Sequence, residues 1–364
     1  MTDRDRSPKH PTSKMLSTQR KQPAPLIYRQ SGMTLVEIMI SLLIGAFLLG
    51  GVLQIFTNTK QTYRMQEGLS RMQENARFAL DTLNHDLRMA GYQGCTVVSP
   101  NVIIDPKSPN PNPAPASLAL GTMITISGND NIANNWNSSA CGNANACIAG
   151  SDAITITFGG TCGGALPEKA STAQIHINAG NTCDFNQYDI VMVSDCSAAD
   201  IFIATSASSS AGKQNLAHAN NQNTDNKLSK IYDEGAEVFR FNSYTYFLRS
   251  GAGGQPALWR LDNSRAVQTG VNPIEMIDGI ENMQILYGED TTQDRVANRY
   301  VTANNVGNWA NVVSARASLL ARSLNDNITS RPQTYTFNGA TVTPADRRVR
   351  QVFTTTIAVR NRLP

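Results

Sequence analysis

The 364-residue sequence lacks the short motifs that carry common enzymatic chemistry. It has no GxGxxG or GxxxxGKS/T phosphate-binding pattern and no HExxH pair for a catalytic zinc ion. No two of its six cysteines form a CxxC pair, and its four histidines are scattered along the chain. We therefore predict no enzyme activity, no catalytic residue, no cofactor and no metal site.

Two further patterns lack the spacing that their chemistry requires. Segments 128–132 and 288–294 are rich in the Asp and Asn oxygens that calcium prefers, but neither has EF-hand spacing, so calcium binding stays an open alternative. Segment 159–164 (GGTCGG) follows a predicted strand without a helical pattern after it. It therefore predicts a hairpin turn and not a phosphate loop.

A strong excess of one charge is also absent from most of the chain. The formal net charge is +3, yet residues 1–32 alone hold seven Lys or Arg and two Asp, a net +5. The remainder is therefore weakly acidic, and no nucleic-acid partner is indicated. Because 41% of the residues are hydrophobic and only 16% are charged, the chain can form a sizeable core.

One apolar segment is long enough to cross a membrane. Residues 38–56 include no charge over 19 positions, and at about 1.5 Å per residue they just span the hydrocarbon. The basic flank predicts a cytoplasmic N-terminus and an exported chain after residue 57. No small-residue cleavage site follows, so the segment differs from an ordinary signal peptide. Glu37 stands directly before it, where a carboxylate is costly unless it is paired.

The helical pattern continues beyond the apolar segment. Apolar residues recur at spacings of three and four from Met65 to Leu87, and no proline interrupts residues 33–90. Gly91 is a candidate C-cap. We therefore predict one helix over 33–90, about 87 Å long.

Alternating apolar and polar residues predict strands in the rest of the chain. The Ser- and Asn-rich stretch 206–226 predicts a boundary or a loop. The C-terminal arginines from Arg347 to Arg362 are interpreted as a solvated edge strand, with a partner-facing patch as the alternative. The predicted strands are 123–126, 153–158, 189–193, the hairpin 243–249 with 257–261, 280–287, 311–320 and 349–359.

All the cysteines lie between residues 95 and 196, on the exported side. An even number in an exported segment predicts disulfides, and free thiols or a metal are the weaker alternatives. The pairing stays open, although Cys141 and Cys147 close the shortest loop. The candidates are Cys95, Cys141, Cys147, Cys162, Cys183 and Cys196.

The segment from Gly32 to Glu37 (GMTLVE), followed by an apolar helix, resembles the class III signal of type IV prepilins and pseudopilins. In that superfamily a prepilin peptidase cleaves after the glycine and methylates the new N-terminus. The resemblance therefore implies cleavage between Gly32 and Met33, with N-methylation of Met33. It also implies that Glu37 pairs with the α-amino group of Met33 in an adjacent subunit during assembly.

Three C-terminal segments, 274–288, 314–323 and 348–362, are similar to the PilW family of type IV pilus assembly proteins. They resemble the J-type minor pseudopilin of type II secretion less closely. The resemblance implies an α+β, type IV pilin-like fold. Its long N-terminal helix, transmembrane and then amphipathic, packs on an antiparallel β-sheet head with an irregular Cys-rich insertion. The expected parts are a prepilin leader (1–32), a transmembrane half-helix (33–56), an amphipathic half-helix (57–90), a Cys-rich region (91–225) and a C-terminal antiparallel β region (226–364).

The function that this resemblance implies is that of a minor pilin, which primes assembly of a type IV pilus and is incorporated near its tip. The implied partners are the other minor pilins, the major pilin, the prepilin peptidase, the inner-membrane assembly platform and a tip adhesin. The implied location is the inner membrane, with one pass and a periplasmic head, and then the pilus at the cell surface. Twitching motility, cell adhesion and DNA uptake are not distinguished. The alternatives are a type II secretion pseudopilin and a signal-anchored periplasmic enzyme or binding protein.

Overall fold

The computed structural model describes residues 32–108, 116–142, 144, 146–178, 180–210, 212–265 and 271–362. The predicted leader, apart from Gly32, lies outside the described residues. The chain divides into two compact units, Met1–Asn58 and Thr59–Pro364. We call the second unit the head and describe each unit by itself.

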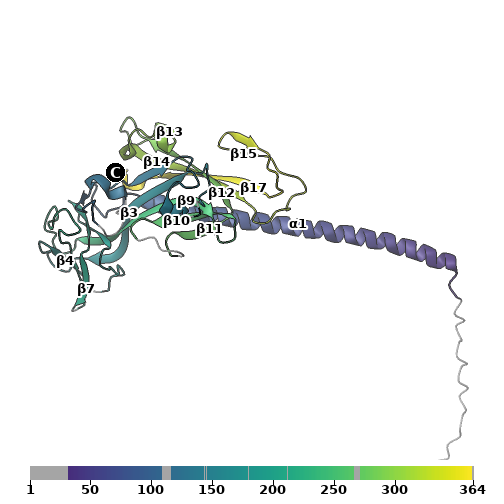
Figure 1. The fold of residues 1–364 in the computed structure, drawn as a ribbon, viewed down its shortest axis with the longest axis horizontal. Helices are drawn as coiled ribbons and strands as arrows, with labels where there is room; N and C mark the ends of the chain where they lie inside the picture. Colours follow the sequence, from purple (N-terminus) through teal and green to yellow (C-terminus); the bar gives the residue numbers. More distant parts are fainter. Residues whose placement is uncertain are drawn as a thin grey trace, which may run out of the picture. The chain divides into compact units, whose positions relative to one another are not determined.

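The elements of secondary structure are shown in Figure 1. The helices are α1 (Leu35–Met89) and α2 (Ser138–Cys141), with 3₁₀-helices η1 (Ala116–Gly121), η2 (Ala303–Asn305), η3 (Trp309–Asn311) and η4 (Arg360–Arg362). The strands are β1 (Asn101–Val102), β2 (Ile126–Asn129), β3 (Ala153–Ala165), β4 (Gln174–Ile177), β5 (Ile190–Ser194), β6 (Ala199–Ile203), β7 (Ser206–Ser210), β8 (Lys213–Ala217), β9 (Glu237–Ser250), β10 (Pro256–Asp262), β11 (Ile274–Asp278), β12 (Ile280–Glu289), β13 (Arg299–Val301), β14 (Val312–Arg322), β15 (Tyr335–Phe337), β16 (Ala340–Val342) and β17 (Arg350–Ala358).

Helix α1 is one continuous helix of 55 residues, as its spacing predicts. It ends at Met89, and Gly91 follows with a φ of 75°. The Gly91 N–H donates to the carbonyl of Thr157 at 2.8 Å. A glycine after the helix is required here because this left-handed conformation is costly for other residues.

In the first unit, the large apolar side chains of α1 are exposed, including Phe47 at 86%. Among the described residues, α1 is the one helix that is long and apolar enough to cross a membrane, with a mean hydropathy of 2.3 over its most apolar window. This surface suits contact with lipid or with other helices.

In the head, one face of α1 is buried. Met72, Ala76, Ala79, Leu83 and Leu87 are each at most 2% exposed. The predicted stripe is therefore confirmed over most of its length. Its first predicted member, Met65, is 43% exposed, so the buried face begins later than its spacing predicts.

Two main sheets make up the head. The larger has eight strands, with the order β1-β6-β5-β9-β10-β11, β3 paired to β9, and β2 paired to β3. The smaller has the order β13-β12-β14-β17. Their pairs are antiparallel except β1 with β6. The largest core cluster joins the buried face of α1 to apolar residues of both sheets, among them Ile154, Tyr246, Met283 and Leu319.

Most predicted strands match observed ones, but three predictions are wrong. The strand expected at 123–126 is β2, which begins at Ile126. The stretch 206–226 contains the β7–β8 pair and is not a loop throughout. Segment 159–164 is no hairpin turn but the later part of β3. Its glycines allow close packing instead, because a Cβ at Gly164 would stand 2.8 Å from the Cys183 sulfur.

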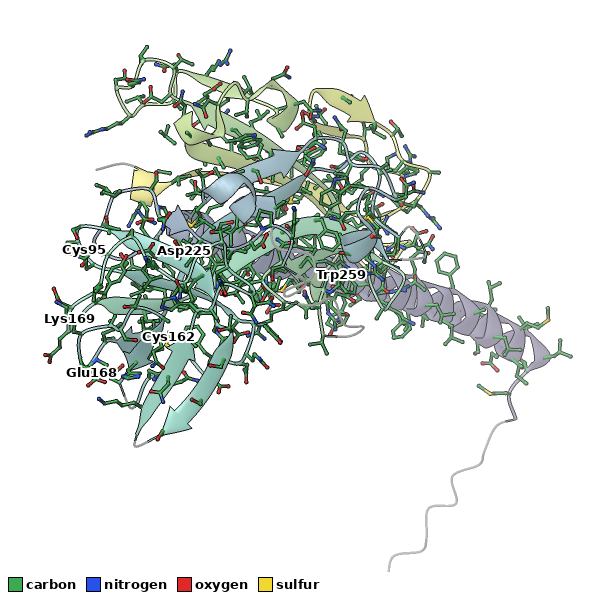
Figure 2. The ribbon with its side chains drawn as sticks, turned by 60° about the vertical axis from the view of Figure 1, so that its left-hand side comes forward. Cys95, Cys162, Glu168, Lys169, Asp225 and Trp259 are labelled. Atoms are coloured by element: carbon green, nitrogen blue, oxygen red, sulfur yellow. A yellow bond between two sulfur atoms is a disulfide. The ribbon has the colours of Figure 1, made fainter. Side chains whose placement is uncertain are left out.

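Three disulfides join the six cysteines: Cys95–Cys196, Cys141–Cys147 and Cys162–Cys183. Figure 2 labels Cys95 and Cys162, one partner from each of two of these bonds. The first bond ties the segment after α1 to the turn between β5 and β6, and the third ties β3 to the segment before β5. Disulfide formation is thus confirmed, including the short Cys141–Cys147 loop.

Candidate functional site

The residues predicted to be processed lie just before α1. Gly32, Met33 and Thr34 have no regular secondary structure and are exposed, with Met33 at 69%. Among the described residues, no atom lies within 4 Å of the position that a Gly32 Cβ would take. The backbone between Gly32 and Met33 is therefore accessible to a peptidase.

Thr34 and Glu37 form reciprocal hydrogen bonds at the start of α1. The Thr34 N–H donates to Glu37 Oε2 at 2.9 Å, and the Thr34 hydroxyl donates to the same oxygen at 3.0 Å. In return, the Glu37 N–H donates to Thr34 Oγ1 at 3.3 Å. This is a capping box, in which two side chains satisfy backbone groups that the first helical turn leaves without a partner.

The capping box gives Glu37 a role that sequence reasoning missed. The Thr34-x-x-Glu37 spacing was a readable signal for it. Cleavage after Gly32 would place the new α-amino group on Met33, one residue before the capping threonine. Glu37 thus has a partner within its own chain, while its pairing with Met33 of another subunit stays a prediction.

Three glycines interrupt the large side chains of the apolar segment. A Cβ at Gly45, Gly50 or Gly51 would have no atom within 4 Å among the described residues. Small residues on an apolar helix allow neighbouring helices to approach closely. This part of α1 is therefore suited to packing with other helices.

Within the head, polar contacts hold α1 on the larger sheet. The Tyr246 hydroxyl donates to the Asp86 carboxylate at 2.5 Å, and both residues are buried. Burial, together with the nearby Asp86 charge, raises the pKa of Tyr246. Nearer the first unit, the Gln61 side chain donates to the carbonyl of Ile328 at 2.6 Å.

The comparisons with known proteins bear on both ends of the chain. Residues 245–361 match the family described as Type IV Pilus-assembly protein W, and residues 27–53 match the prokaryotic N-terminal methylation motif. The C-terminal part of the chain is therefore similar to the PilW family of type IV pilus assembly proteins, and its N-terminal part carries the methylation motif of prepilins. No curated protein and no solved structure matches it. The methylation motif and the long apolar helix fit a membrane-anchored pilin.

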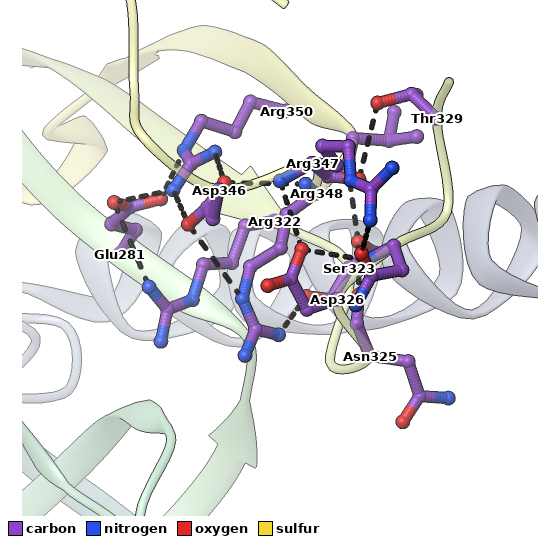
Figure 3. A network of polar contacts seen from close by, with 12 residues as sticks. Glu281, Arg322, Ser323, Asn325, Asp326, Thr329, Asp346, Arg347, Arg348 and Arg350 are labelled. Atoms are coloured by element: carbon purple, nitrogen blue, oxygen red, sulfur yellow. Dashed lines mark hydrogen bonds and ion pairs between the residues drawn. The ribbon is translucent and has the colours of Figure 1, made fainter. Parts of the chain in front are cut away.

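The PilW match contains the whole four-stranded sheet and the arginines just before and at the start of β17. Figure 3 shows these arginines in a network of polar contacts. The Arg350 side chain is only 3% exposed and contacts Glu281 and Asp346, each at 2.6 Å. The hydrogen bond from Arg350 lowers the pKa of Asp346 to about 2. β17 is the edge strand of this sheet and is mostly exposed, as predicted. The Arg350 side chain is the exception, because it is buried and links β17 to β12.

The two segments considered for calcium use their carboxylates within the head. Asp130 accepts the backbone N–H of Ala303 at 2.8 Å, and Asp290 accepts those of Gln293 and Arg295, each at 2.7 Å. No group of three or more metal-binding side chains occurs in the part of the chain that the structure describes. These carboxylates fix loop conformations.

Proposed function

We propose that this chain is a minor pilin that primes assembly of a type IV pilus and enters it near the tip, after cleavage following Gly32. The observation that carries the proposal is the combination on one chain of a methylation motif and a PilW-family head, joined by the continuous helix α1. The match to the Type IV Pilus-assembly protein W family by itself supports a role in type IV pilus assembly.

Glu37 would direct the assembly step. In an isolated subunit its carboxylate is held by Thr34. Once Met33 is the N-terminus, its α-amino group supplies a positive charge at the same end of the helix. Opposite charges attract strongly in the low dielectric of a helix bundle, whereas either one alone is penalised. Pairing between subunits would therefore fix the register of an incoming helix.

The size of the head supports a position near the tip. The head extends from Thr59 to Pro364 and contains three disulfides. A head of this size is difficult to repeat along a shaft and easier to place at an end. The partners that this position implies are other minor pilins, the major pilin and a tip adhesin. The prepilin peptidase and the inner-membrane platform would act earlier, while the head is periplasmic.

A J-type pseudopilin of type II secretion would share the processing and the charge pair. The match to a type IV pilus assembly family favours the pilus. Deletion of the chain distinguishes the two, since a pseudopilin is needed for secretion through the outer membrane and a minor pilin for surface pili.

The test replaces Glu37 by Gln and, separately, Thr34 by Ala. Gln at position 37 keeps the capping box but removes the charge, so we expect normal cleavage and accumulation with few or no surface pili. Ala at position 34 removes the cap but keeps the carboxylate, and we expect pili to form. The measurements are immunoblotting for processing and electron microscopy of sheared pili.

Full piliation by the processed Glu37→Gln protein would contradict the charge-pair role. Glu37→Ala provides a check on membrane insertion, which should be equal or better by about 2–3 kcal/mol because a carboxylate is lost from the bilayer.

A further inference from the structure

A cavity of about 240 Å³ lies on the face of the larger sheet that is turned away from α1. Side chains alternate between the two faces of a strand. Ile154 and Ile156 of β3 belong to the core cluster with α1, so Thr155 between them points to the other face. The same holds for β9, where Tyr246 belongs to the core and Thr245 lines the cavity. The cavity is therefore separate from the core that holds the helix.

Three hydroxyl side chains from neighbouring strands form the floor of the cavity. Ser127 of β2 is the partner of Thr155 on β3, and Thr155 is the partner of Thr245 on β9. The hydroxyls of Thr155 and Thr245 lie 2.7 Å apart, and Asn263 Nδ2 donates to Thr245 Oγ1 at 2.9 Å. These contacts fix the floor before a ligand arrives, which lowers the entropy cost of binding.

Four of the lining side chains offer a polar group to a ligand. Within the described ranges, these groups have no hydrogen-bond partner: Ser127 Oγ, the Asn129 amide, Trp136 Nε1 and Asn263 Oδ1. Asn129 is exposed, the other three residues are partly exposed, and none of these atoms is sealed from solvent. A molecule in the cavity can therefore reach them and take the place of water as their partner.

Trp136 supplies the aromatic surface of the cavity, and the chain around it is fixed. On one side, the Cys147 N–H donates to the carbonyl of Asn134 at 3.3 Å, and Cys147 is joined to Cys141. On the other side, the Asn137 side chain caps the N-terminus of α2. The disulfide loop therefore sets the position of the indole ring, which is ready for binding without further ordering.

The lining restricts the chemistry of the ligand. Every described residue that lines the cavity is uncharged. A phosphate, carboxylate or ammonium group would therefore enter without a counter-charge, which is costly. The free groups combine a donor on Trp136, an acceptor on Asn263, and both kinds on Ser127 and Asn129. The ligand is thus a neutral molecule that both donates and accepts hydrogen bonds and has an apolar part for the indole.

A saccharide ring has all these properties in a small volume. Each of its hydroxyls is both a donor and an acceptor, and its C–H groups form an apolar surface. An extended peptide fits less well, because its N–H and C=O groups are spread along a strand and need a long groove. The cavity is smaller than the roughly 300–1,000 Å³ of sites for drug-sized ligands, so it suits one ring.

We propose that this cavity binds one ring of a neutral saccharide. The ring hydroxyls exchange hydrogen bonds with Ser127 and Asn129, accept from the Trp136 N–H and donate to Asn263 Oδ1. The C–H groups of the ring contact the indole. This binding activity goes beyond the proposed function and does not depend on it, and it would give the head an adhesive activity of its own.

The test is binding of the full chain to immobilised oligosaccharides, in a detergent that has no sugar headgroup. The array carries neutral hexose-terminated chains of cell surfaces, chitin-type chains of N-acetylglucosamine typical of cell walls, sialylated chains and uncharged peptides. We expect binding to neutral saccharides and none to the sialylated chains or the peptides. The two neutral sets tell which source of saccharide the cavity prefers. Calorimetric titration with the bound saccharide then gives its affinity.

Substitutions then assign the binding to the cavity. Ser127→Ala and Asn129→Ala each remove one hydrogen-bonding group, so each should weaken binding by about three- to tenfold. Trp136→Ala should weaken it by roughly tenfold or more. Because the Ser127 and Asn129 side chains have no partner in the described part of the chain, both variants should keep the unfolding temperature of the wild type. Ser208→Ala, at an exposed position of β7, is the matched control and should bind normally.

Three results would overturn the proposal. The first is that no neutral saccharide binds to the folded chain. The second is that the sialylated chains or the peptides bind as tightly as the neutral saccharides. The third is that Ser127→Ala and Asn129→Ala bind as tightly as the wild type, which would place the saccharide elsewhere on the head.

Discussion

Individual buried polar residues link segments of the head that are far apart in the sequence. Asp152, which is 3% exposed, accepts the backbone N–H of Asn131 at 2.9 Å and that of Ile285 at 2.7 Å. Its carboxylate thus ties the start of β3 to β12. Burial raises the pKa of Asp152 to about 6, although the two hydrogen bonds oppose this shift.

This raised pKa predicts a specific dependence of stability on pH. The folded state holds the Asp152 proton more tightly than the unfolded chain, whose carboxyl has a pKa of about 3.9. The associated stability is therefore fully present below pH 4 and is lost as the pH rises through about 6, by roughly 2–3 kcal/mol. The Asn side chain of the Asp152→Asn variant stays neutral at every pH, so the stability of this variant should lack the pH-dependent loss.

The measurement is thermal unfolding of the full chain in detergent between pH 4 and pH 7. The stability of the wild type relative to Asp152→Asn should fall over this interval. Asp81→Asn, at an exposed position of α1, is the control and should follow the wild-type curve. A difference in stability between the wild type and the Asp152→Asn variant that stays constant with pH would contradict the assignment.

Only some of these residue contacts are predictable from the sequence. The Thr34-x-x-Glu37 capping box depends on neighbours within one turn, so its pattern is visible in the sequence. The contacts of Asp86 with Tyr246, and of Arg350 with Glu281, join residues that are 160 and 69 positions apart. Such pairs depend on the tertiary fold, and no local pattern predicts them.

At the scale of elements, helix α1 combines two surfaces on one helix. Its first part exposes large apolar side chains, whereas its later part buries a face against the head. Ala76 and Ala79 are fully buried, which lets the helix approach the sheets closely. The apolar residues of the buried face recur with the 3.6-residue period of an α-helix. Because this period can be read from neighbouring residues alone, the helix was predictable.

The buried face should be sensitive to truncation of its side chains. Leu83 is 0% exposed, so Leu83→Ala should lower the free energy of unfolding by about 2–5 kcal/mol through lost contacts and a cavity. Phe78 lies on the same helix at 45% exposure, and Phe78→Ala should cost much less despite removing a larger side chain. Chemical denaturation of the purified full chain measures both. Equal losses for the two variants would contradict the assigned helix face.

Strand prediction succeeded where side chains alternate and failed where the backbone itself packs closely. The alternating residues of β12 and β17 gave both strands within three residues of their observed ends. The glycines of β3 instead suggested a turn, because glycine is common both in turns and at close backbone contacts. The hairpin of β9 with β10 was predicted and is confirmed. The pairing of the other strands and of two of the three disulfides depends on tertiary contacts, so no local pattern predicted it.

The whole molecule combines an exposed apolar helix with a disulfide-bonded head. The fold class was predictable because the methylation motif and the C-terminal strands resemble a known family. The arrangement of the head as two sheets was not predictable from the sequence, and neither was the cavity on the outer face of the larger sheet. Segments from separate parts of the chain line that cavity. We propose that the chain is a prepilin, which is cleaved and then assembled.

The most direct test is mass spectrometry of the N-terminus in cells that contain the prepilin peptidase. We predict a mature chain that begins with N-methylated Met33 and lacks residues 1–32. Gly32→Val should retain the leader, since the exposed glycine precedes the cleaved bond. A wild-type chain that keeps its leader, in cells where the major pilin is processed, would contradict the account.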